Sequence, residues 1–420
     1  MEEVRLISRG LTSEQIPLFP ENVNSLFIDN NELTNIDFLE KRFYKKVSLN
    51  SNKIVIEKLN NITSEYLSLD NNNIKNLEIN NCKINTLSLT KNKITEIKFI
   101  NSDIHTLNLG YNNISCLESF PENIKLLFLQ GNQIETLSQI PESIEQIDIS
   151  NNNLRDISFL NNKNFVKVNL MNNNNLMIDR VYGIKSNFFI LSYCGIKDIV
   201  FENCNLDKLD LMSNDLEKIN FINSRIIRMN LSLNKLKEFL NFPEQIQEIN
   251  IEENELEKIA IFPDSLIKIN LSNNSLNEIL NIPKQLKHFD LSENFLTNFN
   301  FDDLPEKIEY LDITKNRLDI KKICPDYLRK TKNIDNFYYD VVTETNNKSN
   351  INKIENLKQD FSETSNPNEV LKIINNKNID LSKIYATGTC GENNKLNEIN
   401  NISDDPLTKE EIIIKWNLKL

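Results

Sequence analysis

The 420-residue sequence contains few of the residues from which most catalytic and metal-binding sites are built. It has 2 histidines, His105 and His288, which are far apart in the chain, and no Cys/His cluster with zinc spacing. Its 7 glycines form no glycine-rich phosphate loop, and the segment 388–391 matches neither common loop motif. We therefore expect no metal, no cofactor and no enzymatic activity.

Cysteine usage and the lack of long apolar runs bear on the cellular compartment. The 6 cysteines stand singly, with no C-x-x-C pair, which is typical of reduced structural thiols. Residues 1–5 include no apolar signal region, and no run of 18 apolar residues occurs anywhere. The sequence thus predicts a cytoplasmic protein without a membrane span.

The dominant feature of the sequence is a repeat of about 20 residues, which has the length of a known class of short repeats. Residues 206–216 show its pattern, L-x-x-L-x-L-x-x-N-x-L, and similar segments recur from one end of the chain nearly to the other. The Asn position is filled by Asn31, Asn52, Asn72, Asn92, Asn112, Asn132, Asn152, Asn173, Asn214, Asn234, Asn254, Asn274, Asn294 and Asn316. Cys194 takes the remaining position, which makes 15 repeats.

Residues 1 to about 320 therefore resemble the leucine-rich-repeat family. Leu209-Asp210-Leu211 alternates apolar and polar residues, as a strand with one buried face requires. The Asn turns inward, where its amide can satisfy backbone groups of neighbouring coils. No single repeat can bury its apolar face alone, so the repeats must stack. The expected fold is a mainly β solenoid, curved, with a concave parallel sheet whose inner edge runs on the order of 70 Å.

The back side of the repeats comes in two forms. One form has Pro, as in Phe120-Pro121-Glu122, and the other has Asn followed by a small residue, as in Asn81-Cys82. Pro is excluded from helix interiors, and a short repeat leaves no room for a full helix, which predicts an extended or short-turn convex side. The Pro-bearing copies resemble the short repeats of bacterial leucine-rich-repeat effectors, whereas the Asn-Cys and Asn-Ser copies depart from that pattern. For an effector or a viral protein, the expected compartment is the host cytoplasm.

The pattern divides the chain into four segments. We expect residues 1–22 to form an N-terminal cap, residues 23–320 the solenoid of 15 repeats, and residues 321–330 a C-terminal cap. From 331 to 420 the sequence is polar and aperiodic, which predicts a partly disordered tail with short helices.

The outward positions of the strands provide the candidate binding residues. Residues two, four and six before each Asn should point outward from the sheet. Most are polar, but repeats six to ten place apolar residues there, namely Leu126, Phe128, Met171, Phe188, Ile190 and Met212. An exposed apolar cluster of this kind indicates a partner-binding site. The alternatives are that the tail or a second copy covers the cluster, or that register slips near Asn173 misplace it.

Charge narrows the class of partner. Residues 321–420 contain 15 basic and 15 acidic residues, so the formal net charge of −12 belongs to residues 1–320. Toward the C-terminal end the outward positions carry Asp210, Glu248, Glu252, Asp290 and Asp312, interleaved with Lys208, Arg228 and Lys268. An acidic solenoid fits nucleic acid and anionic lipid poorly, so neither is an expected partner.

The resulting hypothesis is a non-enzymatic interaction scaffold that binds a protein on its concave face, anchored by Phe128, Phe188 and Ile190, with the acidic strands selecting a basic or mixed-charge surface. The alternative is an effector-like adaptor, or a ubiquitin-ligase-type enzyme, that acts through the C-terminal tail. Cys390-Gly391-Glu392 is only loosely similar to the catalytic Cys of bacterial leucine-rich-repeat ligases, and the tail is much shorter than their ligase domain. Neither the partner nor the oligomeric state follows from the sequence.

Overall fold

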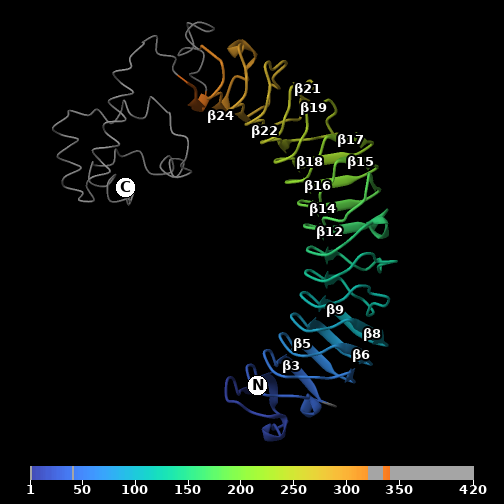
Figure 1. Ribbon diagram of the computed structural model, residues 1–420. Coiled ribbons are helices and arrows are strands. Elements are labelled where there is room, and N and C mark those ends of the chain that lie inside the picture. The colour runs from blue at the N-terminus through green and yellow to red at the C-terminus, as the bar shows by residue number, and fades with distance from the viewer. Residues whose placement is uncertain (1, 40–41, 320–333, 341–420) are drawn as a thin grey trace, which may run out of the picture.

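The computed structural model describes residues 2–39, 42–319 and 334–340, which form one curved solenoid. Figure 1 shows an open arc in which each coil advances by one repeat and the strands line the inner side. The described segments contain no α-helix, so no helix there is long and apolar enough to span a membrane. The predicted mainly β solenoid of about 20-residue coils is confirmed.

The inner side of the arc is one parallel sheet of 17 strands. Each strand pairs with the corresponding strand of the next coil, as Leu209 of β16 does with Phe189 of β14 and Met229 of β18. In spatial order the strands are β1 (Glu2–Arg5), β2 (Val23–Phe27), β3 (Phe43–Ser48), β5 (Thr63–Ser68), β7 (Lys83–Ser88), β9 (Asp103–Asn108), β10 (Leu126–Phe128), β11 (Gln146–Asp148), β12 (Asn164–Asn169), β14 (Lys185–Ile190), β16 (Asn205–Asp210), β18 (Arg225–Asn230), β20 (Glu248–Asn250), β22 (Lys268–Asn270), β23 (His288–Asp290), β24 (Ile308–Asp312) and β25 (Ile334–Tyr338).

The outer side of the arc carries only short elements. Two three-stranded parallel sheets consist of β4 (Lys58–Asn60), β6 (Asn76–Asn80) and β8 (Glu96–Ile100), and of β13 (Arg180–Tyr182), β15 (Asp198–Glu202) and β17 (Lys218–Ile222). A further pair is β19 (Glu238–Phe239) and β21 (Lys258–Ile259). Single 3-10 turns occupy Ser13–Gln15, Asp37–Leu39, Ser158–Leu160 and Phe301–Asp303. The expected extended or short-turn convex side is therefore present.

The core lies between the two sides and is built from the fixed apolar positions of the repeat. Leu206, Leu209, Leu211 and Leu216 have no exposed surface, and the corresponding residues of the other coils join them in one continuous cluster. Burying a Leu side chain contributes about 1.5–3 kcal/mol, so every coil depends on its neighbours for stability.

The repeated Asn forms a ladder through this core. The side-chain oxygen of Asn214 accepts hydrogen bonds from the backbone N–H groups of Cys194 (2.9 Å) and Ile196 (3.1 Å). Its amide group donates to the carbonyls of Leu191 and Leu211, both at 2.9 Å. The side chain thus satisfies backbone groups of two successive coils that the turn leaves without a sheet partner.

A second ladder follows the outer sheets. After β6 and β8 the side chains of Cys82 and Ser102 turn inward; the Ser102 hydroxyl donates to the carbonyl of Ile79 at 3.0 Å and accepts the N–H of Cys82 at 3.2 Å. Cys204 and Ser224 repeat this arrangement after β15 and β17. The Asn before each of these residues has a positive φ (Asn81, 48°; Asn101, 47°), a conformation that Asn adopts more readily than most residues. This explains the Asn-Cys and Asn-Ser form of the repeat.

Both ends of the described solenoid carry an additional strand. β1 pairs with β2, and Asn31 accepts the N–H groups of Arg9 and Leu11 at 3.0 Å, so part of the expected cap, 1–22, continues the coil. At the other end β25 pairs with β24. β25 lies within the expected tail, 331–420, but it continues the sheet, and Phe337 packs against Phe301 of the last coil with ring centroids 6.1 Å apart. The proposed C-terminal cap, 321–330, lies outside the described residues, as does the tail from 341.

Candidate interaction surface

Three rows of outward side chains run along the concave sheet. They correspond to the positions six, four and two residues before each ladder Asn, and the strand register aligns them from coil to coil. In the coil of β16 these positions are Lys208, Asp210 and Met212. Because their backbone is fixed by the sheet on both sides, the rows form a rigid surface.

The six apolar residues singled out in the sequence lie on this face but do not form one cluster. Leu126 and Phe128 lie on β10, and Phe188 and Ile190 on β14. The register places β11 and β12 between them, with polar side chains in both rows, so the two pairs are about 14 Å apart. Each pair is a separate apolar spot.

Met171 and Met212 belong to the third row and follow β12 and β16. Ser192 occupies the corresponding position of the coil between them, so they are not in adjacent positions. Phe188 is 44% exposed and Met171 37%, whereas Leu126, Phe128, Ile190 and Met212 are half-buried. Phe188 is therefore the most exposed of the six.

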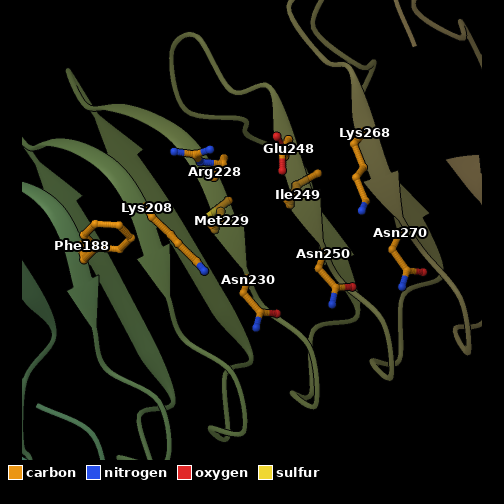
Figure 2. A pocket seen from close by; sticks show the side chains of 10 residues that line it. All are labelled: Phe188, Lys208, Arg228, Met229, Asn230, Glu248, Ile249, Asn250, Lys268 and Asn270. Atoms are coloured by element: carbon orange, nitrogen blue, oxygen red, sulfur yellow. The ribbon is translucent and has the colours of Figure 1, made fainter. Parts of the chain in front are cut away.

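The concave face is hollowed next to Phe188. A cavity of about 500 Å³ extends from β14 to β22, and Figure 2 shows the side chains that line it. It is lined by Phe188, Lys208, Arg228, Met229, Asn230, Glu248, Ile249, Asn250, Lys268 and Asn270. Phe188 and the charged residues can each be recognised in the sequence. The hollow cannot, because it depends on the curvature and register of five strands.

The basic residues of the hollow have no ionic partner within the part of the chain that the structure describes. Lys208, Arg228 and Lys268 are exposed, and none makes a salt bridge or side-chain hydrogen bond with another described residue. Other basic residues nearby are paired, for example Lys235 with Asp215 (2.6 Å) and Lys287 with Glu309 (2.9 Å). The cations of the hollow are thus available to a ligand.

An aromatic and acidic cluster lies further along the face, at the C-terminal end. The Tyr310 ring stacks on His288, with centroids 6.4 Å apart, and its centroid lies 5.5 Å from that of the tilted Tyr338 ring. The Tyr310 hydroxyl donates to Asp290 Oδ2 (3.4 Å) and Asp312 Oδ2 (3.3 Å). Burial, together with the Asp290 charge, raises the pKa of the Asp312 carboxyl, and burial likewise raises the pKa of Tyr310. These groups already satisfy one another.

The N-terminal coils present cations over aromatic rings instead. The Arg5 guanidinium lies 4.4 Å from the centre of the Phe27 ring, and the Lys46 ammonium lies between the rings of Phe27 (5.4 Å) and Tyr66 (5.2 Å). Such contacts are worth about 0.5–1 kcal/mol at exposed sites. They stabilise the face where the first strands carry few apolar side chains.

The described residues provide little for catalysis. His288 Nε2 lies 3.2 Å from Glu309, and His105 Nδ1 lies 3.8 Å from Asp103, each without a nucleophile beside it. Burial raises the pKa of the Cys194 thiol to about 11 and also raises the pKa values of Cys82 and Cys204, which disfavours the reactive thiolate. Within the described ranges no group of three or more His, Cys, Asp or Glu side chains is placed to hold a metal. Cys324 and Cys390 lie outside those ranges.

Comparison with known proteins finds similarity at the level of structure alone. No protein family matches the sequence, and no curated protein does. YopM, a leucine-rich effector protein from Yersinia pestis, is 19% identical over 80% of this chain and 88% of its own, with a TM-score of 0.46. A leucine-rich-repeat protein of Leptospira interrogans is also 19% identical, over 77% and 93% of the two chains, with a TM-score of 0.36. The leucine-rich-repeat domain of APL1B is 16% identical over 80% and 88%, with a TM-score of 0.33.

These identities are too low to carry function from one protein to another. The fold follows instead from the chain itself, since its coils have the 20-residue spacing, the buried Leu positions and the Asn ladder. The chain folds as a leucine-rich-repeat solenoid built from short repeats of about 20 residues.

Proposed function

We propose that this chain is a protein-interaction scaffold that binds a protein partner on its concave face. The observation that carries the proposal is the surface around Phe188, where an exposed aromatic ring adjoins a hollow lined by cations that make no ion pair with a described residue. An exposed aromatic anchor in a concave, polar-rimmed surface is typical of protein-binding sites. Ile190, beside Phe188 on β14, extends the apolar contact.

The rigid frame supports this role. A partner that docks on the sheet orders few residues of the scaffold itself, because the strands are held on both sides and the core is complete without a ligand. Binding then loses little conformational entropy on this side of the interface. The half-buried Leu126 and Phe128 on β10 would form a second apolar contact about 14 Å away.

The convex side offers a comparison surface. Leu240, Ile261 and Leu280 are 58%, 70% and 61% exposed and lie on three successive coils outside the concave sheet. If the scaffold used its convex side, these residues would be the apolar anchors. They therefore provide the matched control for the concave site.

The experiment is affinity capture from lysate of cells that express the chain, with three forms of the protein compared. We expect the wild type to retain a protein that a Phe188→Asp, Ile190→Asp variant loses and an Ile261→Asp variant keeps. Asp is tolerated in these strands, as Asp210 and Asp290 show, and circular dichroism would verify that all three forms are folded. Loss of the same partner only from the Ile261 variant would refute concave binding.

The alternative, an adaptor or ubiquitin-ligase-type enzyme acting through the tail, concerns residues outside those described. It predicts that removing residues 341–420 abolishes the captured partner or a ubiquitin-transfer activity. The scaffold proposal predicts that the same truncation keeps the partner, since every strand of the concave sheet remains.

A further inference from the structure

We infer that the hollow between Phe188 and Asn270 binds a short acidic segment of the protein partner. This inference rests on the proposed function and specifies its chemistry. It differs from the sequence-based expectation that the acidic C-terminal strands select a basic or mixed-charge surface, because it takes into account which charges are paired among the described residues.

The first argument is the local charge. Six neighbouring strands, β12 to β22, present one row with Lys167, Phe188, Lys208, Arg228, Glu248 and Lys268. The row thus holds four cations and one carboxylate in a chain whose formal net charge is −12. Since none of the four cations makes an ion pair with a described residue, the row is a local positive patch that attracts anions.

The second argument is the row of amides beside these cations. The side-chain oxygens of Asn230, Asn250 and Asn270 accept the backbone N–H groups of Ser232 (3.1 Å), Glu252 (3.1 Å) and Ser272 (2.9 Å). Because a backbone N–H requires an oxygen acceptor, each amide NH2 group is directed away from that bond. The NH2 groups of Asn230 and Asn250 have no acceptor among the described residues, whereas that of Asn270 donates to Glu252 (3.2 Å).

The hollow therefore combines the ammonium and guanidinium groups of Lys208, Arg228 and Lys268 with the amide donors of Asn230 and Asn250, and Glu248 is the one carboxylate among its lining residues. Figure 2 shows the Lys208 side chain extending toward Asn230, and that of Lys268 extending toward Asn250 and Asn270. Carboxylates and phosphates are the ligands that satisfy such donors best, through charge-assisted hydrogen bonds.

The third argument is the spacing of the cations. Lys208 and Arg228 lie on adjacent strands, and Lys268 lies two strands beyond Arg228, which is about 10 Å. An extended peptide that crosses the strands covers this distance in about three residues. Phe188, one strand before Lys208, would contact an apolar side chain at the end of such a segment.

The same spacing disfavours a nucleic acid. Its backbone carries a phosphate at every nucleotide, and one of these would meet Glu248 between Arg228 and Lys268. A nucleic-acid chain that continued past the hollow would also reach Asp290 and Asp312. Two acidic residues about three positions apart, next to an apolar residue, fit the hollow without these repulsions.

The test uses a library of random 12-residue peptides displayed on phage and selected against the full-length chain. We expect the selected peptides to be enriched in Asp and Glu about three positions apart, beside an apolar residue. A Lys208→Glu, Lys268→Glu variant should lose this enrichment. The matched control, Lys218→Glu with Lys258→Glu, makes the same charge change on β17 and β21 of the outer side and should keep it.

A selected peptide with a fluorescent label then gives the affinity. The concave variant should weaken its binding about tenfold or more, and the control variant should leave it unchanged. Selected peptides without acidic residues, or equal binding by both variants, would overturn the inference. So would a labelled 20-nucleotide single-stranded RNA that binds more tightly than the peptide and depends on Lys208 and Lys268.

These results separate the inference from the proposed function. If the capture experiment identifies Phe188 as essential while the library yields no acidic peptides, the concave face binds its partner by other chemistry. If acidic peptides bind but the captured partner is lost only from the Ile261 variant, the hollow is a peptide site and the proposed function is wrong.

Discussion

At the scale of single residues, the ladder Asn is the most demanding position of the repeat. Asn214 accepts two backbone N–H groups and donates to two carbonyls within a core closed to water, whereas Asn72 accepts one N–H, that of Ile54, and donates to the carbonyls of Leu49 and Leu69. A purely apolar side chain fits the space but leaves these groups unpaired. An unpaired buried polar group costs about 1–3 kcal/mol, which explains why the position is so restricted.

We predict that Asn214→Ala lowers the free energy of unfolding by about 2–4 kcal/mol, because four backbone groups lose their partner at once. Asn85→Ala, at an exposed position of β7 without a side-chain hydrogen bond to the described residues, should change it by less than about 0.5 kcal/mol. Urea denaturation followed by circular dichroism measures both. Equal effects of the two substitutions would contradict the role of the ladder.

Cys194 shows how much of this residue-level detail the sequence contains. Its place in the ladder is evident from spacing alone, and the thiol donates to the Leu170 carbonyl at 3.3 Å. A thiol is a poor acceptor, however, and the previous coil compensates, since the N–H of Leu176 bonds to the carbonyl of Asn173 (3.1 Å) within a local turn. That turn depends on the local backbone geometry after Asn173 and could not be predicted from residue types.

At the scale of strands and turns, apolar periodicity predicted where the concave strands run, because alternation and the Leu positions fix one buried face. It did not predict that β4, β6 and β8 would pair on the outer side. That pairing depends on the left-handed conformation of Asn81 and Asn101 and on the hydroxyl of Ser102, whose bonds join successive coils. The Asn-Cys and Asn-Ser form of the repeat can be seen in the sequence, but the hydrogen bonds and the backbone conformation that explain it cannot.

The register of the strands also decides the candidate site. The sequence grouped six apolar residues because they occur in neighbouring repeats, and each does lie on the concave face. Their separation into two spots follows from Gln146, Asp148, Lys167 and Asn169 on the strands between them. The hollow beside Phe188 results from side chains of five coils and has no local sequence signal.

Strand β24 provides a prediction about pH. Burial and the nearby Asp290 charge raise the pKa of Asp312, so the folded protein binds a proton there more tightly than the unfolded chain. The free energy of unfolding therefore falls as the pH rises from 3.8, the ordinary pKa of the carboxyl, through its raised pKa in the folded protein. Above the raised pKa this loss of stability is complete. Asp312→Asn should remove it, since Asn fills the same role at Asn230, Asn250 and Asn270.

We expect Asp312→Asn to raise the free energy of unfolding at pH 7, and the gain to vanish when the pH falls below 3.8. Denaturation curves at a series of pH values measure the difference between variant and wild type. Asp198→Asn, an exposed position on the outer strand β15, serves as the control and should show no such trend. A gain that persists at low pH would mean that charge is not its cause.

At the scale of the whole molecule, the solenoid separates stability from binding. The buried Leu positions and the Asn ladder hold the coils together, while the outward rows vary freely from coil to coil. An acidic chain can therefore carry a cationic hollow in the middle of its concave face. Net charge alone gives the expectation that nucleic acid is not a partner, but it contains no information on where the cations without an ionic partner among the described residues lie.

The most direct test of concave binding is site-specific photo-crosslinking. A benzophenone amino acid placed at Phe188, on the concave strand β14, is compared with one at Tyr182, which is 37% exposed on the outer strand β13 of the same coil. Both positions are natively aromatic and exposed, so the two proteins differ only in the face that carries the probe. We predict a crosslinked partner from position 188 and none from position 182; crosslinking of that partner only from position 182 would contradict the account.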